Sequence, residues 1–412
     1  MKLEDPIGII ELGDVNLKCL IFKINKENNL EILSSVVTES DGIQNELVVN
    51  LKKASNAIRS IISKAEKIAN ISLKKINVVF EQPDFLCTNF SKHKKIDGSK
   101  IQRHDIEFLL REGKKQLTLN DKTQSIIHIF NHNYIVDGKI FAEEPIEVFA
   151  DTLSHEMTFI TAPINNLKNI NQAFIECDIE IERLISQTFA LGAKLFDSNE
   201  LRSGSVLINL ESKKISLGIF KNLALVHSTT SSFGIDYITS DISKVCSLNL
   251  EEAEKITNNF DFSFQNNQNL FDENNYLKSI FFIKSNFRKI SKKLILDVVK
   301  ARLDEIFEML KKQLFIPGFN FNSGFNFLLA GEGTKLSNLG IYTANFFSLN
   351  VNKIDIFNNK DHDDLEKNFA SCFGALKIIK DGWETEAIPE VNGKNIHKTG
   401  FFRKIFDNYW RN

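Results

Sequence analysis

The sequence is poor in features that cross-link a chain or carry it through a membrane. Its 412 residues include only 5 cysteines, Cys19, Cys87, Cys177, Cys246 and Cys372, and no Cys-x-x-Cys pair. This odd, scattered set argues against a disulfide framework or a zinc site and predicts reduced thiols in a cytoplasmic protein. No apolar run reaches the roughly 18 residues of a transmembrane helix. The acidic start, Met-Lys-Leu-Glu-Asp-Pro, does not favour a signal peptide.

An excess of charge of either sign is also missing. Lys and Arg number 51 and Asp and Glu number 53, which argues against a protein whose whole surface binds nucleic acid. The 42% hydrophobic residues are ordinary for a globular protein, and the length corresponds to two or three domains. Only phenylalanine is unusual, with 35 residues against 5 Tyr and 2 Trp. Because the chain is also rich in Lys, Asn and Ile, A/T-rich codons explain this excess without a function.

The first 80 residues have the order strand, strand, strand, helix, strand. Apolar patterns predict strands at 7–12, 17–24, 30–37 and 76–80. Apolar residues three and four positions apart predict a helix over 46–70. A similar order begins again with predicted strands at 205–210, 215–220, 223–228 and 327–330. Two copies of one α/β unit predict two similar halves around a cleft.

Two insertions separate these elements. The first, at about 81–160, predicts a Lys/His-rich loop at 91–95, a helix at 101–116, and strands at 125–130, 133–136 and 146–150. The second, at about 245–310, predicts a helix from Leu250, a polar loop at 258–275, and a long helix over 277–314 that Pro317 and Gly318 end. Residues 381–399 have the composition of a linker, although an ordered arm is the alternative.

Two glycine turns are candidates for phosphate or nucleoside binding. The turn Gly13, Asp14, Val15, Asn16 joins two predicted strands, and exposed N–H groups in such a turn can cradle a phosphate. The same residues also fit an ordinary hairpin turn. Gly331, Glu332 and Gly333 follow a buried strand and precede residues 334–339, as in a strand–turn–helix junction that binds phosphate or nucleoside.

The corresponding hairpin of the second half lacks glycine. Its turn reads Glu211, Ser212, Lys213, Lys214, so side chains crowd the position that a phosphate would approach. Asn209 is neutral where an Asp would be needed for Mg²⁺ or water activation. Lys213 and Lys214 either contact phosphate or are exposed turn lysines. We therefore predict a weakened nucleotide site, with no catalytic residues, rather than an active hydrolase.

Other candidate sites are weaker. His128 and His132 have the spacing of two metal ligands on a helix, but their segment reads as strand–turn–strand, which predicts structural histidines. Residues 361–364 are acidic and predict a helix cap rather than a cation loop. The sequence has no nucleophile elbow and no Walker lysine loop. We expect no metal site.

The last residues form an amphipathic pattern. One face carries Phe401, Phe402, Ile405, Phe406, Tyr409 and Trp410, and the other includes Arg403, Lys404 and Arg411. Aromatic residues opposite basic ones are typical of an interfacial membrane helix. A helix that docks on the domain or on a partner is the alternative. A single such anchor binds weakly and reversibly, and a polymer of the protein would add many anchors together.

Taken in their order along the chain, the predicted strands, turns, insertions and terminal segment resemble FtsA. This is the actin-like bacterial cell-division family that tethers FtsZ filaments to the inner membrane. Residues 10–13 are similar to the family's first phosphate strand and turn, and residues 233–242, with Gly234, to the segment after its second phosphate hairpin. Residues 252–256, with Glu254, are similar to the helix of its nucleoside pocket. Residues 330–333 are similar to its adenosine turn and residues 373–376 to its closing helix.

The chain departs from the family pattern at several nucleotide positions. These are Asp14 for the usual Thr, Asn16 for a frequent Lys, residues 211–214 for a Gly-rich loop, Asn209 for an acid, Glu332 for a Gly, and Thr257 for a frequent Lys. The resemblance implies binding of ATP with Mg²⁺, and the departures imply weak binding without hydrolysis.

The resemblance also implies the domain organisation. It implies an actin-like, ribonuclease-H-like α/β fold of duplicated β-β-β-α-β halves with an FtsA-type insertion. The implied boundaries are 1–80 and 161–200 for the first half, 81–160 for the insertion, 201–244 and 321–380 for the second half, 245–320 for an inserted lobe, 381–398 for a linker and 399–412 for a membrane helix.

The implied function is that of a non-enzymatic scaffold. Such a protein lies on the cytoplasmic face of the inner membrane at the septum and forms filaments there. It binds the C-terminal peptide of FtsZ through the 245–320 lobe and recruits later division proteins, with no nucleic acid as a partner. An actin-like adaptor of another envelope assembly, such as a pilus platform, and a kinase of the actin and sugar-kinase superfamily are the alternatives.

Overall fold

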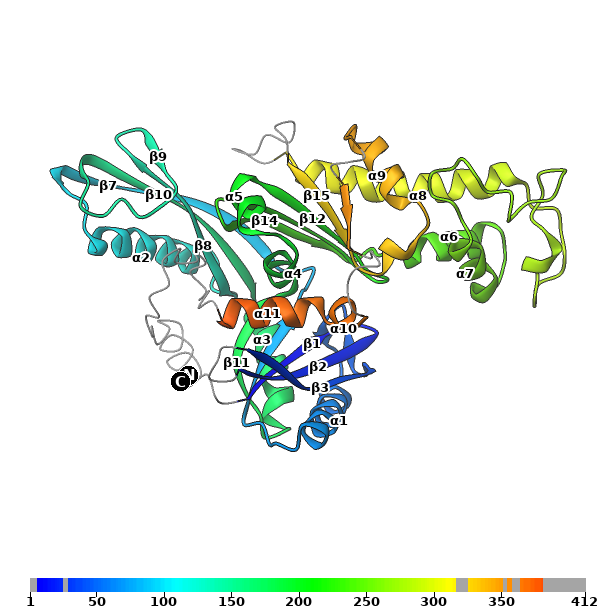
Figure 1. The fold of residues 1–412 in the computed structure, drawn as a ribbon, viewed down its shortest axis with the longest axis horizontal. Helices are drawn as coiled ribbons and strands as arrows, with labels where there is room; N and C mark the ends of the chain where they lie inside the picture. Colours follow the sequence, from blue (N-terminus) through cyan, green and yellow to red (C-terminus); the bar gives the residue numbers. More distant parts are fainter. Residues whose placement is uncertain (1–5, 25–28, 316–324, 351–353, 358–363, 381–412) are drawn as a thin grey trace. The chain divides into compact units, whose positions relative to one another are not determined.

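A computed structural model describes residues 6–24, 29–315, 325–350, 354–357 and 364–380 (Figure 1). The described residues form two compact units. The first unit lies within residues 1–203 and 218–228 and continues from residue 368, and the second lies within 204–217 and 229–367. The predicted linker 381–398 and the predicted membrane helix 399–412 lie outside the described residues.

The first unit contains the predicted β-β-β-α-β order. Strands β1 (Ile7–Leu12), β2 (Asn16–Ile24) and β3 (Leu30–Glu39) pair antiparallel, and β6 (Lys75–Phe80) and β11 (Glu180–Ser186) continue the sheet in parallel. The order across this sheet is β11-β6-β1-β2-β3. The apolar strands are confirmed because both faces of β1 and β6 are buried.

The helix between these strands starts later than its apolar pattern predicts. Helix α1 (Leu51–Ala69) begins after Asn50, whose side chain accepts a hydrogen bond from the N–H of Lys53 at 3.1 Å. The preceding residues form a small hairpin of β4 (Ile43–Gln44) and β5 (Leu47–Val48) instead. An Asn in extended conformation is a strong N-cap, and it sets the first turn of the helix here.

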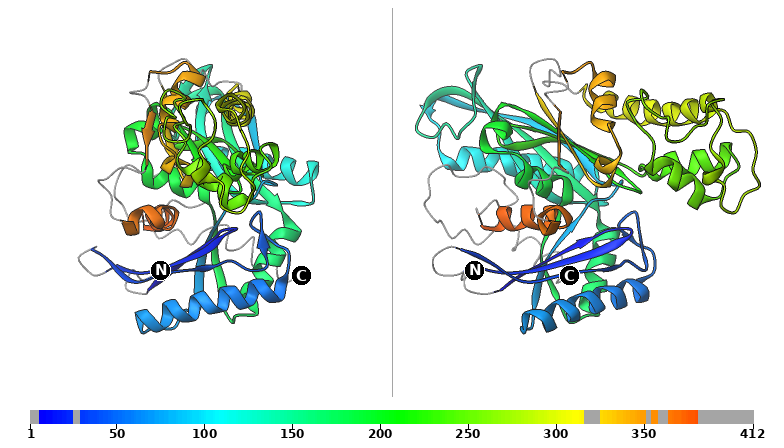
Figure 2. Two further views of the ribbon diagram at one scale, coloured as in Figure 1. Left: turned by 90° about the vertical axis from the view of Figure 1, so that its right-hand side faces the viewer. Right: turned by 45° about the vertical axis from the view of Figure 1, so that its right-hand side comes forward.

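Helices cover both faces of the first sheet (Figure 2). Helices α1 and α3 (Ile164–Ile175) lie on one face, and α4 (Gln187–Leu195) and α11 (Ala370–Lys380) lie on the other. Helices α4 and α11 approach closely at Gly374, where an added Cβ would lie 1.8 Å from the carbonyl oxygen of Ala190. Only glycine permits this contact.

The insertion of the first unit is a separate four-stranded sheet. Its order is β7-β10-β8-β9, and helix α2 (Arg103–Asn120) packs against β7 and β10. The strands are β7 (Leu86–Lys100), β8 (Gln124–Val136), β9 (Lys139–Phe141) and β10 (Phe149–Pro163).

Three predictions for this insertion were wrong. Residues 91–95 belong to β7 rather than to a loop, and β8 is one bulged strand rather than strand–turn–strand. The strand predicted at 146–150 starts at Phe149 and runs to Pro163. Strand β7 is at the sheet edge, where polar residues are tolerated. Its Lys94 turns back to α2 and pairs with Asp105 at 2.5 Å.

The second half repeats the three-strand order. Its strands are β12 (Ser205–Leu210), β13 (Ile215–Lys221), β14 (Ala224–Ser231), β15 (Asn326–Ala330) and β16 (Ile354–Ile356). They follow the order β14-β13-β12-β15-β16, with β12 and β15 parallel. Short helix α5 (Ser198–Ser203) precedes β12. The predicted duplication of the strand order is therefore present.

Helices of the second unit lie between β14 and the end of the described chain. They are α6 (Asp236–Val245), α7 (Leu250–Asn258), η1 (Ser279–Phe281), α8 (Lys292–Gln313), η2 (Glu332–Lys335), α9 (Leu339–Phe347) and α10 (Asp364–Asn368). Helix α7 starts as predicted, because Asn249 and Glu252 form a capping box. After Gly331, a short 3-10 turn precedes α9, which begins only at Leu339.

The predicted helix over 277–314 is shorter than its pattern suggests. Helix α8 begins at Lys292, where the side chain of Ser291 caps the N–H of Leu294 at 3.3 Å. The upstream residues are non-helical apart from η1, and the N–H of Leu277 donates to the carbonyl of Ile290 at 2.9 Å. Contacts distant in sequence therefore replace helical hydrogen bonds over 277–290.

Candidate functional site

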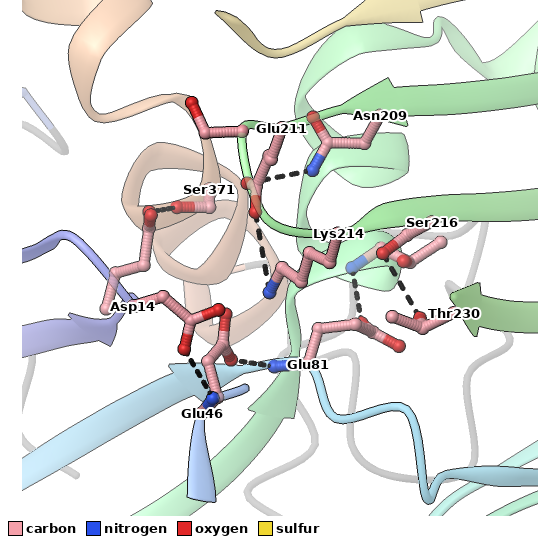
Figure 3. A network of polar contacts seen from close by, with 12 residues as sticks. Asp14, Glu46, Glu81, Asn209, Glu211, Lys214, Ser216, Thr230 and Ser371 are labelled. Atoms are coloured by element: carbon pink, nitrogen blue, oxygen red, sulfur yellow. Dashed lines mark hydrogen bonds and ion pairs between the residues drawn. The ribbon is translucent and has the colours of Figure 1, made fainter. Parts of the chain in front are cut away.

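The first candidate turn lies between β1 and β2. A Cβ on Gly13 would lie 2.5 Å from the carbonyl oxygen of Asn16, so the turn requires glycine. Asp14 in this turn accepts a hydrogen bond from the N–H of Glu46 at 2.7 Å (Figure 3). Val15, the next residue of the turn, is exposed. The turn thus presents a carboxylate, tied to its own unit, at the position where the sequence suggested a phosphate.

Two buried carboxylates of the first unit, Glu11 and Glu46, also accept hydrogen bonds within that unit. Glu11, at the end of β1, accepts from the ammonium of Lys18 at 2.8 Å and contacts the hydroxyl of Ser371 on α11. The carboxylate of Glu46 accepts from the N–H of Glu81. Each acid is therefore compensated by a donor of the same unit, as buried charges require.

Glu81 caps helix α4. Its carboxylate accepts from the hydroxyl of Ser186 at 2.7 Å and from the N–H of Thr188 at 2.9 Å. A negative charge is favourable at a helix N-terminus. Sequence reasoning missed Glu46 and Glu81, although Glu81 directly follows a buried strand, and polar residues at the carboxyl ends of parallel strands commonly form sites.

The second-half hairpin turn holds its charged side chains in pairs. Glu211 accepts from the side-chain amide of Asn209 at 3.0 Å and lies 3.5 Å from the ammonium of Lys214, which is 2% exposed (Figure 3). Lys213 is paired with Asp236 at 3.1 Å. Both lysines that the sequence offered for phosphate are thus engaged with carboxylates.

The structure brings the glycines of the second half together around this hairpin. A Cβ on Gly234 would lie 2.1 Å from the carbonyl oxygen of Ser212, and one on Gly333 would lie 2.7 Å from Leu210. Gly331 has a φ of +87° and packs equally closely on Leu210. Glu332 accepts a hydrogen bond from the hydroxyl of Ser212. Glu254, by contrast, lies on the exposed side of α7.

These second-half residues do not fit the phosphates of a nucleotide. A phosphate cradle needs outward backbone N–H groups and a positive local charge. Here the N–H of Glu211 already donates to the carbonyl oxygen of Lys214 at 3.0 Å, and a Cβ on Gly234 would lie 2.5 Å from the backbone N of Lys213. The side chains around the turn carry three carboxylates, Glu211, Asp236 and Glu332, against the two paired lysines. The close glycines serve backbone packing in this arrangement.

The two histidines with metal-like spacing lie along strand β8. His128 is buried and its Nε2 accepts from the N–H of Ser186 at 2.9 Å. Burial lowers the pKa of His128 to about 3, so the ring is neutral. Among the residues that the structure describes, no three His, Cys, Asp or Glu side chains gather in a metal-binding group.

Within the described part of the chain, no helix has both the length and the apolar character to cross a membrane.

Comparison with known proteins gives these observations a family context. The model of the SHS2 domain inserted in FtsA matches residues 85–161, which span β7 to β10. The cell division protein FtsA of Rhizobium meliloti is 20% identical over 364 residues, which cover 85% of this chain and 81% of the relative. FtsA of Neisseria meningitidis is 21% identical over 348 residues, covering 84% and 82%. The chain is a distant relative of FtsA.

The fold agrees with this relationship. A solved PilM-PilN type IV pilus biogenesis complex contains a chain that superposes with a TM-score of 0.59 at 12% identity, covering 93% of this chain and all of that one. This likeness concerns the fold alone, which is the actin-like arrangement of two α/β halves. The inserted four-stranded sheet is the feature that connects the chain with FtsA in particular.

Proposed function

We propose that this protein is an actin-like scaffold of cell division. It forms filaments on the cytoplasmic face of the inner membrane, anchors FtsZ filaments at the septum and recruits later division proteins. The observation that carries this proposal is the SHS2 insertion of FtsA at residues 85–161 within a chain that aligns with FtsA over 85% of its length.

Membrane attachment is assigned to residues 399–412. The aromatic face of this segment, including Phe402, Phe406 and Trp410, would enter the lipid interface, and its Arg and Lys residues would meet anionic headgroups. Each buried aromatic contributes about 1.5–3 kcal/mol, which the ordering of a short helix opposes. Filament formation would join many such anchors and make attachment firm.

Co-sedimentation with anionic liposomes tests the anchor. The full chain should bind, and a chain truncated before residue 399 should stay in the supernatant. The double substitution Phe402→Ser and Phe406→Ser should also release the protein, whereas Asn408→Ser on the polar face is the matched control. Equal binding by the truncated and full chains would refute this assignment.

The lobe at 245–320 is the proposed site for the C-terminal peptide of FtsZ. Its surface exposes Val245, Leu250, Ile280 and Phe287, and Ile280 is 72% exposed. Residues 274–296 also carry Lys and Arg at six positions and no Asp or Glu. An apolar surface with basic residues suits an acidic, apolar peptide.

Fluorescence anisotropy with a labelled FtsZ C-terminal peptide tests this site. Ile280→Ser with Phe287→Ser should weaken binding at least tenfold. Leu119→Ser, a 67% exposed apolar residue of the other unit, is the matched control. No binding by a folded chain would favour the alternative of an adaptor for another envelope assembly.

We assign no enzymatic activity. A kinase of the same superfamily would need a catalytic carboxylate beside glycine-lined phosphate turns, whereas neutral Asn209 precedes the paired residues 211–214. ATP with Mg²⁺ is the ligand that the resemblance implies, and the second-half residues support at most weak binding.

A further inference from the structure

We propose that side chains of the second half hold two of its turns together, in the place where a related protein would hold a nucleotide. Both turns are ones whose sequence position suggests phosphate or nucleoside binding. One turn is the β12–β13 hairpin, residues 211–214. The other is the turn after β15, residues 331–335. The direct bridge between them is the hydrogen bond from the hydroxyl of Ser212 to the carboxylate of Glu332.

The topology explains why the two turns meet. Strands β12 and β15 are neighbours and run parallel, with Asn209 opposite Ala330 at their ends. In open α/β sheets, ligands bind outside the carboxyl ends of neighbouring strands. In this chain a serine hydroxyl and a carboxylate from the two turns occupy that place and satisfy each other.

A second set of contacts fixes the hairpin to the start of α6. The N–H of Ile235 donates to the carbonyl of Glu211 at 3.0 Å, and that of Asp236 to the carbonyl of Ser212 at 3.1 Å. The ammonium of Lys213 then pairs with the carboxylate of Asp236 at 3.1 Å. These bonds engage two N–H groups at the start of α6, the kind of donor that can bind a phosphate, with carbonyl oxygens of the hairpin.

A third set lies on the hairpin itself. Asn209 donates to Glu211, and Glu211 pairs with the buried ammonium of Lys214. An ammonium that burial has removed from water requires such a partner. Glu211 thus compensates Lys214 as an anionic ligand would. Exposed ion pairs such as Lys213–Asp236 contribute little singly, so the bridge depends on the three sets acting together.

Order in this region should therefore be independent of ATP. The inference rests on contacts within the second unit and goes beyond the proposed scaffold function. The liposome and FtsZ-peptide experiments that test that function do not depend on nucleotide. Hydrogen exchange of the full chain, read by mass spectrometry, reports on both turns at once.

In the unmodified protein, the amides of 211–215, 234–238 and 331–336 should exchange at the same rates with and without 5 mM ATP and Mg²⁺. Ser212→Ala should speed exchange several-fold at 211–215 and at 331–336 together. Glu332→Ala should do the same, and Glu332→Gln, which retains an acceptor, should restore the original rates. Ser232→Ala, at an exposed serine of the same unit, is the control.

Two results would overturn the proposal. One is slower exchange at these turns in the unmodified protein with ATP and Mg²⁺, because it would mean that nucleotide adds order. The other is unchanged exchange at 331–336 in both alanine variants. The comparison with ATP uses the unmodified chain and so does not depend on the folding of any variant.

Discussion

Glu252 of helix α7 accepts both the backbone N–H of Ser285, at 2.8 Å, and its hydroxyl, at 2.5 Å. The same carboxylate accepts from the N–H groups of Ile283 and Lys284 and from that of Asn249. One fully buried acid therefore holds the non-helical segment that precedes α8 against the start of α7. This segment exposes Ile280 and Phe287 of the proposed peptide site.

Loss of this carboxylate should loosen the lobe. Glu252→Gln replaces an acceptor of several N–H groups with an amide that also donates, and we expect a loss of about 2 kcal/mol in the free energy of unfolding. Urea denaturation measures this loss, with Glu273→Gln, an exposed acid of the same lobe, as control. A change below the experimental error would contradict the role of Glu252.

Acid should weaken the same contact. Burial alone would raise the pKa of Glu252, but hydrogen bonds from Ser285, Lys284 and Asn249 outweigh it and lower the pKa to about 2. A lowered carboxyl pKa stabilises the folded state at pH values above the ordinary 4.5, and this stability is lost as the pH falls from 4.5 toward 2. Glu252→Gln should remove that part of the pH dependence.

His155 should make the inserted subdomain sensitive to milder acid. Its ring is fully buried and stacks on Tyr134 at 4.5 Å, and neither ring nitrogen has a hydrogen-bond partner among the described residues. Burial, with a smaller effect of His132, lowers the pKa of His155 to about 3. A folded state that favours the neutral ring loses stability as the pH falls below the ordinary 6.5.

His155→Phe keeps the ring stack without the titration. Between pH 6.5 and 5, the unfolding free energy of the variant should fall less steeply than that of the unmodified chain, by up to about 1.4 kcal/mol per pH unit. His93→Phe, at an exposed histidine of β7, should leave the slope unchanged. Identical slopes for His155→Phe and the unmodified protein would refute the prediction.

Gly374 should tolerate no side chain. Because the added Cβ of Gly374→Ala would overlap the backbone of Ala190, α4 and α11 would have to separate, at a cost of about 1–3 kcal/mol. Thermal unfolding should show a lower Tm for this variant. Asn368→Ala, at the exposed last residue of α10, which belongs to the first unit as Gly374 does, should leave Tm unchanged. An equal Tm for both would show that the helices can move apart freely.

Lys214 should stabilise the fold without any nucleotide. Lys214→Met removes the ammonium that faces Glu211, and we expect a loss of about 1–3 kcal/mol in the absence of ATP. Lys213→Met, at a half-exposed pair, should lose less than 1 kcal/mol. Equal stability of Lys214→Met and the unmodified chain would contradict this stabilising role of Lys214.

Local pattern determined much of this protein. Alternating and continuous apolar runs located β1, β2, β6 and the β12–β14 repeat, and the pattern from Leu250 onward located α7, because side chains at short sequence separation decide these elements. The order of those elements, the turns at Gly13 and Gly331, and the amphipathic pattern of the last residues together gave the resemblance to FtsA.

Tertiary contacts decided the rest. The basic residues 91–95 form part of an edge strand because β10 pairs with them. Residues 277–290 are not part of α8, because their backbone N–H groups donate to Glu252 and to the carbonyl of Ile290 instead. The same holds for charge. The sequence around Lys214 or Glu332 does not show whether either side chain binds a phosphate or pairs within the protein. The fold decides it, because it brings Ser212, 120 residues away, to Glu332, and it buries Lys214 beside its near neighbour Glu211.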